Sequence, residues 1–448
     1  MQGSSEPRDS FSSKFGVIAA AAGSAIGLGN IWRFPSVTAE NGGAAFLFIY
    51  LLCILILGIP VMLSEFLIGR SAQRNPYGAF KKLAPGKAWF ITGLMGVLAA
   101  FMILAFYAVV SGWTLEYLYQ SFTGNLADKN SAELKEMFNS FRNDSYRPLL
   151  WFVVFMGFTA WIIISGIRSG IERYTKILMP MLLVLLIFIA IYVLTLPGAK
   201  EGVKYLFNPD FSKITPDVIF KALGQAFFSL SIGMGTLITY GSYIKKKENL
   251  TGTTLSVVGA DTFIAVLAGI AIFPAVFALT DVQLLDMAKE TEEALMFITL
   301  PSILNNIPGG LILSAMFFVL LAVAALTSTI SMLEVIVSFL VEETKLTRRK
   351  ATIYSTLAVS VLGILSALYV GVFRFLNFTS VNILLPIGGF FIVLFIGWFL
   401  SKKITRDELT NNGSMKGKYI PVYLFLVKYL APIAIAIVFI YGIINALK

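Results

Sequence analysis

Long apolar runs separated by short polar segments dominate the pattern of this chain, which has 448 residues. Most runs are about 18 residues or longer, which is the length that an α-helix needs to cross about 30 Å of hydrocarbon. The pattern therefore predicts an all-α polytopic membrane protein with eleven transmembrane helices. These helices cover approximately residues 14–38, 44–69, 88–122, 149–167, 172–196, 219–243, 254–279, 310–340, 352–370, 379–400 and 420–446.

The composition agrees with a membrane protein and excludes several kinds of chemistry. Hydrophobic residues make up 57% of the chain and charged residues only 13%, whereas a soluble domain carries about 25% charged residues. Histidine is absent, which excludes His metal sites, His proton relays and Ser-His-Asp catalysis, and the lone Cys53 indicates packing. We therefore do not expect an enzyme. Residues 1–13 are polar and precede a full span, so no cleavable signal peptide is expected.

The net charge of +10 is distributed asymmetrically. If the N-terminus is cytoplasmic, most Lys and Arg residues fall in cytoplasmic segments, as the positive-inside rule requires. An odd number of spans then places the C-terminus outside the cell, and we expect the plasma membrane. The excess positive charge is expected to meet anionic membrane lipid, and nucleic acid is not an expected partner.

Two similar glycine strings interrupt predicted helices, IGLG at residues 26–29 in the first span and IGMG at residues 232–235 in the sixth. Because the two spans are an odd number of helices apart, the halves of the chain would be inverted repeats, and matching interruptions indicate a central transporter site. Helix packing through the GxxxG motif of Gly23 and Gly27 is the alternative. The expected organisation is a cytoplasmic tail at 1–13, a five-helix repeat at 14–196, an extracellular loop at 197–218, a second five-helix repeat at 219–400, and a cytoplasmic loop with the last helix at 401–448.

Longer motifs carry a resemblance to a known family. They read GSAIGLGNIWRFP at Gly23–Pro35, ENGGAAF at Glu40–Phe46, GIPVMLSEFLIGR at Gly58–Arg70, FFSLSIGMG at Phe227–Gly235 and ALTSTISMLE at Ala325–Glu334. These motifs resemble the neurotransmitter:sodium symporter family, and in particular its bacterial branch that carries several hydrophobic amino acids. The resemblance implies a leucine-transporter-like fold, with helices 1 and 6 unwound in mid-membrane, and sodium-coupled import by alternating access.

By this resemblance the substrate lies between the two interrupted helices. Its expected contacts are Ala25, Gly27, Gly29, Ile103, Tyr107, Phe228, Ser231, Met234, Ser328 and Met332. The glycine backbone and the Tyr107 hydroxyl would hold the substrate carboxylate, and carbonyls near Ala25, Phe228 and Ser231 would hold its amine. The uncharged pocket with flexible methionines favours hydrophobic L-amino acids, both aliphatic and aromatic. Monoamine carriers of the family have aspartate at the position of Gly27, so glycine favours a substrate that brings its own carboxylate.

The resemblance also implies two sodium sites. The first would use Ala25, Asn30, Ser229 and Asp261, and the second Gly23, Ile26, Ala324, Thr327 and Ser328. Hydroxyls in membrane helices often bond to their own helix, which is the alternative for Thr327 and Ser328. Asp261 is a stronger indication, because a carboxylate inside a membrane is costly. Many relatives have asparagine there and animal members add chloride nearby, so the fixed charge of Asp261 predicts chloride independence.

Expected gates flank the site on both sides of the membrane. Outside, Arg33 would lie above a lid of Tyr107 and Phe228, and Ser380 stands where some relatives have the aspartate that pairs with this arginine. Inside, Arg8, Phe11, Tyr243 and Glu342 resemble the cytoplasmic latch of the family, in which Arg8 would pair with Glu342.

Other residues have two open interpretations. Glu65 either accepts hydrogen bonds from unwound backbone of the sixth span or titrates. Gly170 and Pro180 bound a segment that either unwinds to admit water to the second sodium site or contains an ordinary proline kink. Glu116 and Glu334 are expected at polar rims of the membrane.

Two functions remain beside sodium symport. A proton-driven amino-acid carrier of the same fold would load and release Glu65 or Asp261, although the hydroxyls of Thr327 and Ser328 favour sodium. A channel or a substrate sensor would show no concentrative uptake.

Overall fold

The computed structural model describes residues 10–278, 292–305 and 307–446. Regular secondary structure in these ranges is helical, which confirms the predicted all-α class. The first half contains α1 (Lys14–Ala25), η1 (Gly29–Arg33), α2 (Phe34–Glu40), α3 (Ala44–Cys53), η2 (Ile54–Gly58), α4 (Ile59–Ala72), α5 (Pro76–Leu83), α6 (Phe90–Phe122), α7 (Ser131–Asn143), α8 (Arg147–Ile164), η3 (Ile167–Glu172), α9 (Arg173–Leu194), α10 (Ala199–Phe207) and η4 (Phe211–Lys213). The second half contains α11 (Pro216–Ser229), α12 (Thr236–Ser242), α13 (Leu250–Ala278), α15 (Glu292–Ala294), η5 (Leu295–Thr299), α16 (Leu300–Asn305), α17 (Gly310–Thr344), α18 (Arg348–Leu368), α19 (Val370–Phe378), η6 (Thr379–Leu384), α20 (Leu385–Leu394), η7 (Phe395–Phe399), α21 (Lys402–Leu409), α22 (Ile420–Phe425), η8 (Leu426–Leu430) and α23 (Ala431–Ala446).

Within the described ranges, nine helices are long and apolar enough to cross a membrane. A tenth span is counted if Lys14–Ala25 and Gly29–Glu40, whose axes are bent by 51°, are taken together. The predicted sixth span, residues 219–243, is divided between α11 and α12, and neither helix alone has membrane-crossing length. The count of eleven spans therefore stays a prediction.

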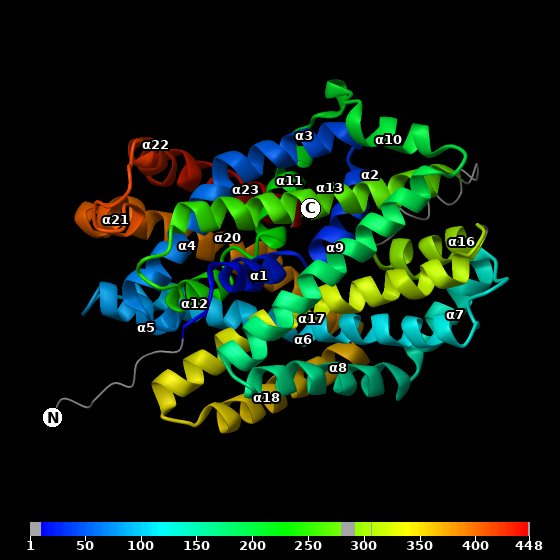
Figure 1. Ribbon diagram of the computed structural model, residues 1–448, viewed down its shortest axis with the longest axis horizontal. Coiled ribbons are helices and arrows are strands. Elements are labelled where there is room, and N and C mark those ends of the chain that lie inside the picture. The colour runs from blue at the N-terminus through cyan, green and yellow to red at the C-terminus, as the bar shows by residue number, and fades with distance from the viewer. Residues whose placement is uncertain (1–9, 279–291, 306, 447–448) are drawn as a thin grey trace.

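The first helix is interrupted where the first glycine string lies. α1 ends at Ala25, the following Ile26 has an extended backbone with ψ 93°, and helical structure resumes at Gly29. Figure 1 shows α1 near the middle of the bundle, where it contacts α9, α12, α13 and α17. Backbone groups freed by this interruption consequently lie in the protein interior, which is where such groups are tolerated in a membrane protein.

The second interruption separates α11 from α12. Ser231, Gly233 and Gly235 all have positive φ there, at 54°, 84° and 75°. A Cβ on Gly233 would lie 2.5 Å from the Leu385 carbonyl oxygen of α20, and one on Gly235 would lie 2.9 Å from Pro76. Glycine is therefore required at both positions for two reasons, a left-handed backbone and a lack of space.

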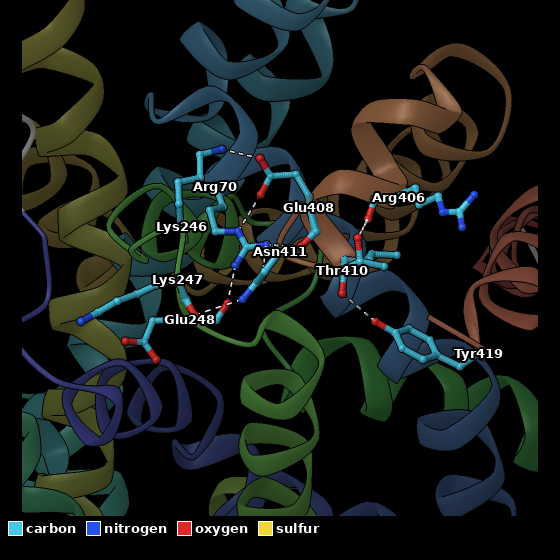
Figure 2. Close-up of polar contacts among 10 residues, drawn as sticks. Arg70, Lys246, Lys247, Glu248, Arg406, Glu408, Thr410, Asn411 and Tyr419 are labelled. Carbon is cyan, nitrogen blue, oxygen red and sulfur yellow. Dashed lines mark hydrogen bonds and ion pairs between the residues drawn. The ribbon is translucent and has the colours of Figure 1, made fainter. Parts of the chain in front are cut away.

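A buried arginine ties three segments together on the side of the predicted cytoplasmic loops (Figure 2). Arg70, at the end of α4, donates from Nε to a Glu408 carboxylate oxygen at 2.6 Å. Its other guanidinium nitrogens donate to the Glu248 and Glu408 carbonyls and to Asn411 Oδ1. Lys246 is a second cation on the Glu408 carboxylate. This cluster fastens α21 to α4 and to the loop between α12 and α13.

We expect Glu408→Ala to destabilise the protein strongly, because the Arg70 side chain is only 1% exposed and would lose its carboxylate. Removing one partner of a buried ion pair costs about 3–5 kcal/mol. Thermal unfolding in detergent measures this effect, and the midpoint temperature of unfolding should be clearly lower in the variant than in the wild type. Lys213→Ala, which removes an exposed ion pair with Asp210, is the control and should leave the midpoint unchanged. Equal midpoints for the two variants would contradict the assignment.

Candidate functional site

A cavity of about 320 Å³ lies between the two helix interruptions. Its lining comes from α1 and the residues after it, from α6, from the α11–α12 break, and from α17. The lining residues are Ser24, Ala25, Gly27, Gly29, Ile103, Tyr107, Phe228, Ser231, Met234, Ser328 and Met332. The structure thus brings together all ten residues expected to contact substrate, and it adds Ser24, which the sequence did not indicate. Their role in binding stays a prediction.

Space at Gly27 is limited by two hydroxyls. A Cβ on this residue would lie 2.7 Å from the Tyr107 hydroxyl oxygen and closer still to Ser328 Oγ. The Tyr107 hydroxyl also accepts a hydrogen bond from the backbone N–H of Leu28 at 2.9 Å. This backbone donor was missed by sequence reasoning, because a main-chain group carries no signal in the residue type.

The residues of the expected first sodium site form one hydrogen-bonded group. Asn30 Nδ2 donates to Asp261 Oδ1 at 2.8 Å, and Ser229 Oγ lies 3.0 Å from both carboxylate oxygens of Asp261. All three residues are buried. Their donor set, one carboxylate with neutral amide and hydroxyl oxygens, suits a hard cation. Among the described residues no cluster of three or more His, Cys, Asp or Glu is present, so a site for a softer transition metal has no support there.

Two further polar residues support this group and were not predicted. The Tyr50 hydroxyl donates to Ser229 Oγ at 3.2 Å, and Gln225 Nε2 donates to the Gly29 carbonyl at 2.8 Å. Both side chains come from neighbouring helices, α3 and α11, and their sequence contexts are ordinary apolar spans. Only the fold shows that Gln225 ties the first interruption to α11 and that Tyr50 ties Ser229 to α3.

The residues of the expected second sodium site also lie together. Thr327 Oγ1 lies 2.9 Å from the Ala324 carbonyl oxygen and 3.5 Å from that of Ile26. Ser328 Oγ lies 3.4 Å from the Ser24 carbonyl oxygen, and a Cβ on Gly23 would lie 3.2 Å from Thr327. The Ala324 bond is of the own-helix kind, so both interpretations of Thr327 remain compatible with this geometry.

A second cavity, of about 490 Å³, adjoins the first on the side of Arg33. Tyr107 and Phe228 line both cavities and so stand between them, and their role as a lid stays a prediction. The Arg33 guanidinium lies over the Phe228 ring, 4.9 Å from its centroid. Ser380 is buried, and its hydroxyl donates to the Leu376 carbonyl of its own helix. We call this second cavity the upper cavity and the first one the lower cavity. Glu293 lines the upper cavity together with Arg33, and sequence reasoning did not predict it there.

Three of the four residues of the expected cytoplasmic latch, Phe11, Tyr243 and Glu342, lie in the described part of the chain. The Phe11 backbone N–H donates to the Tyr243 carbonyl at 3.3 Å, and its ring packs edge-on against Tyr240 and Tyr243. Glu342 accepts hydrogen bonds from the backbone and side chain of Asn75. Arg8 lies outside the described residues, so its pairing with Glu342 stays a prediction.

Glu116 and Glu334, which were expected at polar rims of the membrane, are both buried within the protein, and their depth in the membrane stays a prediction. Each carboxylate is compensated by an arginine from a helix start. Arg348 and the Tyr243 hydroxyl bind Glu334, whereas Arg147 binds Glu116. Both arginines are more exposed than the acids that they pair with.

Buried acids also hold the backbone at two other places. Glu65 Oε1 accepts a hydrogen bond at 2.7 Å from the N–H of Gly233 in the α11–α12 break, as one of its two interpretations predicts. Glu172 accepts from the backbone N–H of Ser12 at 2.7 Å and so anchors the start of the chain before α1, which sequence reasoning missed. Gly170 and Pro180 belong to one helical stretch, Ile167–Leu194, so no unwound segment separates them here.

Comparison with known proteins places the chain among membrane transporters. The model described as "Sodium:neurotransmitter symporter family" matches residues 8–147 and 135–448. The uncharacterized sodium-dependent transporter YhdH of Bacillus subtilis (strain 168) is 39% identical, with 96% of each chain covered. An uncharacterized sodium-dependent transporter of Haemophilus influenzae is 34% identical, with 98% of this chain and 99% of the relative covered.

A solved structure agrees with these sequence matches. The crystal structure of MhsT in complex with L-phenylalanine is similar at a TM-score of 0.89 and 45% identity, covering 97% of this chain and 100% of MhsT. The family and its members named here are transporters rather than enzymes, in agreement with the expectation from composition. The chain therefore belongs to the sodium:neurotransmitter symporter family.

Proposed function

We propose that this protein is a sodium-coupled symporter that imports hydrophobic L-amino acids, aliphatic and aromatic, by alternating access. One observation carries the proposal: the cavity between the two helix interruptions lies directly beside the group of Asp261, Asn30 and Ser229, with Gly29 held to Gln225 between them. The MhsT structure contains L-phenylalanine, and the relatives are sodium-dependent transporters. Both facts support the same substrate class and the same ion.

Two sodium ions are proposed, one at Ala25, Asn30, Ser229 and Asp261 and the other at Gly23, Ile26, Ala324, Thr327 and Ser328. Moving one elementary charge across the membrane is worth about 2.3 kcal/mol per 100 mV. Two sodium ions with a zwitterion would therefore supply roughly 4–5 kcal/mol per 100 mV, before the concentration gradient is counted. That free energy is sufficient for strong accumulation. Asp261 supplies a fixed negative charge, so transport is proposed to be independent of chloride.

The proposed orientation follows the distribution of positive charge. The N-terminus lies in the cytoplasm and the C-terminus outside, in a plasma membrane whose anionic lipid meets the cytoplasmic Lys and Arg residues. Nucleic acid has no proposed role.

A second candidate function is proton coupling through Glu65, and one observation favours it. Its Oε2 is buried and has no hydrogen-bond partner among the described residues, although Oε1 is bonded to Gly233. A carboxyl group with one bonded oxygen could hold a proton on the other. The hydroxyl groups at the second proposed sodium site favour sodium instead.

Uptake of labelled phenylalanine into proteoliposomes separates these functions. We expect concentrative uptake with an inward sodium gradient alone and none with a proton gradient alone. The expected uptake persists when chloride is replaced by gluconate. Uptake in sodium-free buffer driven by protons would establish the second candidate, and equilibration without accumulation under either gradient would indicate a channel.

A further inference from the structure

Four of the residues that line the lower cavity carry a hydroxyl group, and these hydroxyl groups differ in their hydrogen bonding. The Tyr107 hydroxyl accepts from Leu28 N–H, and the hydroxyls of Ser231 and Ser328 are 2.8 Å and 3.4 Å from the Ser24 carbonyl oxygen, to which they donate. The hydroxyl of Ser24 itself is buried, and no partner for it is present among the described residues. Ser24 is 4% exposed and lines the cavity.

A buried hydroxyl without a hydrogen bond is unfavourable, so native structures rarely leave one in this condition. Ser24 is the penultimate residue of α1 and one of the residues that line the cavity. An occupant with a polar atom at this point would remove the penalty. An occupant that is apolar there would leave the penalty in place.

The roles already proposed for the other groups that line the cavity indicate which part of the substrate could bond to the Ser24 hydroxyl. The substrate carboxylate is assigned to the backbone of Gly27 and Gly29 with Tyr107, and the amine to main-chain carbonyls. Those assignments use the groups that every α-amino acid requires, and they leave the Ser24 hydroxyl for the part that differs between substrates.

We propose that Ser24 is a specificity residue whose hydroxyl forms a hydrogen bond with a polar atom on the side chain of an aromatic substrate, namely the phenol of tyrosine or the indole N–H of tryptophan. A serine hydroxyl can both donate and accept, so it can serve either group. This inference rests on the proposed function, because it assumes an amino acid in the cavity.

The test is competition binding in the presence of sodium, with unlabelled phenylalanine, tyrosine and tryptophan displacing labelled phenylalanine from wild-type protein and from Ser24→Ala. We expect the variant to bind tyrosine and tryptophan about three- to tenfold more weakly, which corresponds to one neutral hydrogen bond. Phenylalanine binding should change by less than about twofold, because its ring offers no partner to lose. The decisive quantity is therefore the ratio of the dissociation constants for tyrosine and phenylalanine.

Ser36→Ala is the matched control. The Ser36 hydroxyl on α2 is also buried and also without a partner in the described part of the chain, but it does not line the cavity. Its removal should leave the ratio unchanged. If Ser24→Ala fails to fold, Ser24→Cys, which retains the size of the side chain but donates weakly, should show the same separation of tyrosine from phenylalanine.

Two results would overturn the inference: an unchanged ratio in Ser24→Ala, or equal weakening of all three amino acids, which would assign Ser24 to the common part of the substrate. Failure of the proposed function has a different signature, since wild-type protein would then show no sodium-dependent binding of any of the three.

Discussion

Gly27→Ala is expected to weaken amino-acid binding by about 10- to 100-fold, or to abolish it. The added Cβ would lie 2.7 Å from the Tyr107 hydroxyl oxygen and closer to Ser328 Oγ, so the two groups proposed to contact substrate would have to move. An extra carbon in a well-packed site costs about 1–3 kcal/mol, which corresponds to the expected loss. The dissociation constant of labelled phenylalanine, measured on purified protein in the presence of sodium, gives this loss of affinity.

Gly157→Ala on α8 provides the control, because beyond the adjacent turns of its own helix no atom lies within 4 Å of where its Cβ would be. This variant should bind phenylalanine as the wild type does. Wild-type affinity in Gly27→Ala would show that the cavity accommodates the extra carbon, and the explanation of why glycine stands at this position would then be incorrect.

Asp261→Asn is expected to weaken the apparent affinity for sodium at least about tenfold, because the proposed first site would lose the carboxylate that the protein supplies to it. Losing a charged partner from a buried polar site costs about 2–5 kcal/mol. We further expect chloride to restore part of the lost binding, since an added anion can supply the negative charge. The measurement is sodium-dependent phenylalanine binding with chloride or gluconate as the anion.

Asp217→Asn removes a more exposed carboxylate that pairs with Lys221, and it should behave as wild type in both anions. If Asp261→Asn bound sodium normally and was unaffected by chloride, the carboxylate would not act as a built-in replacement for the anion. The buried bonds of Asp261 to Asn30 and Ser229 would then have a purely structural role.

Much of the candidate site could be predicted because it depends on local signals. Glycine strings mark both interruptions, and the motifs around Gly27, Phe228 and Thr327 occur in one linear order, so the lining residues of the lower cavity other than Ser24 could be named without knowledge of the fold. The predicted spans likewise correspond to observed helices because apolar length is a property of one segment. The division of residues 219–243 into α11 and α12 follows from the same glycines.

The residues that were missed depend on contacts between distant segments. Tyr50 and Gln225 look like ordinary helix residues until the fold places them beside Ser229 and Gly29. Glu172 contacts Ser12 across 160 positions of sequence. Glu334 was expected at a rim because a lone acid is costly inside a membrane. The hydropathy of one segment contains no information about Arg348, which pairs with Glu334 from the start of the next helix.

The shared walls of the two cavities have a thermodynamic consequence. Tyr107 and Phe228 face the lower cavity and also the upper one beside Arg33. A molecule in the upper cavity alters the affinity of the lower cavity only if it shifts a ring that the occupant below contacts, and these two rings are where such a shift would act. Reciprocity then requires the occupant below to alter affinity above by the same factor. Tyr107 and Phe228 are therefore the side chains through which binding in one cavity would change affinity in the other.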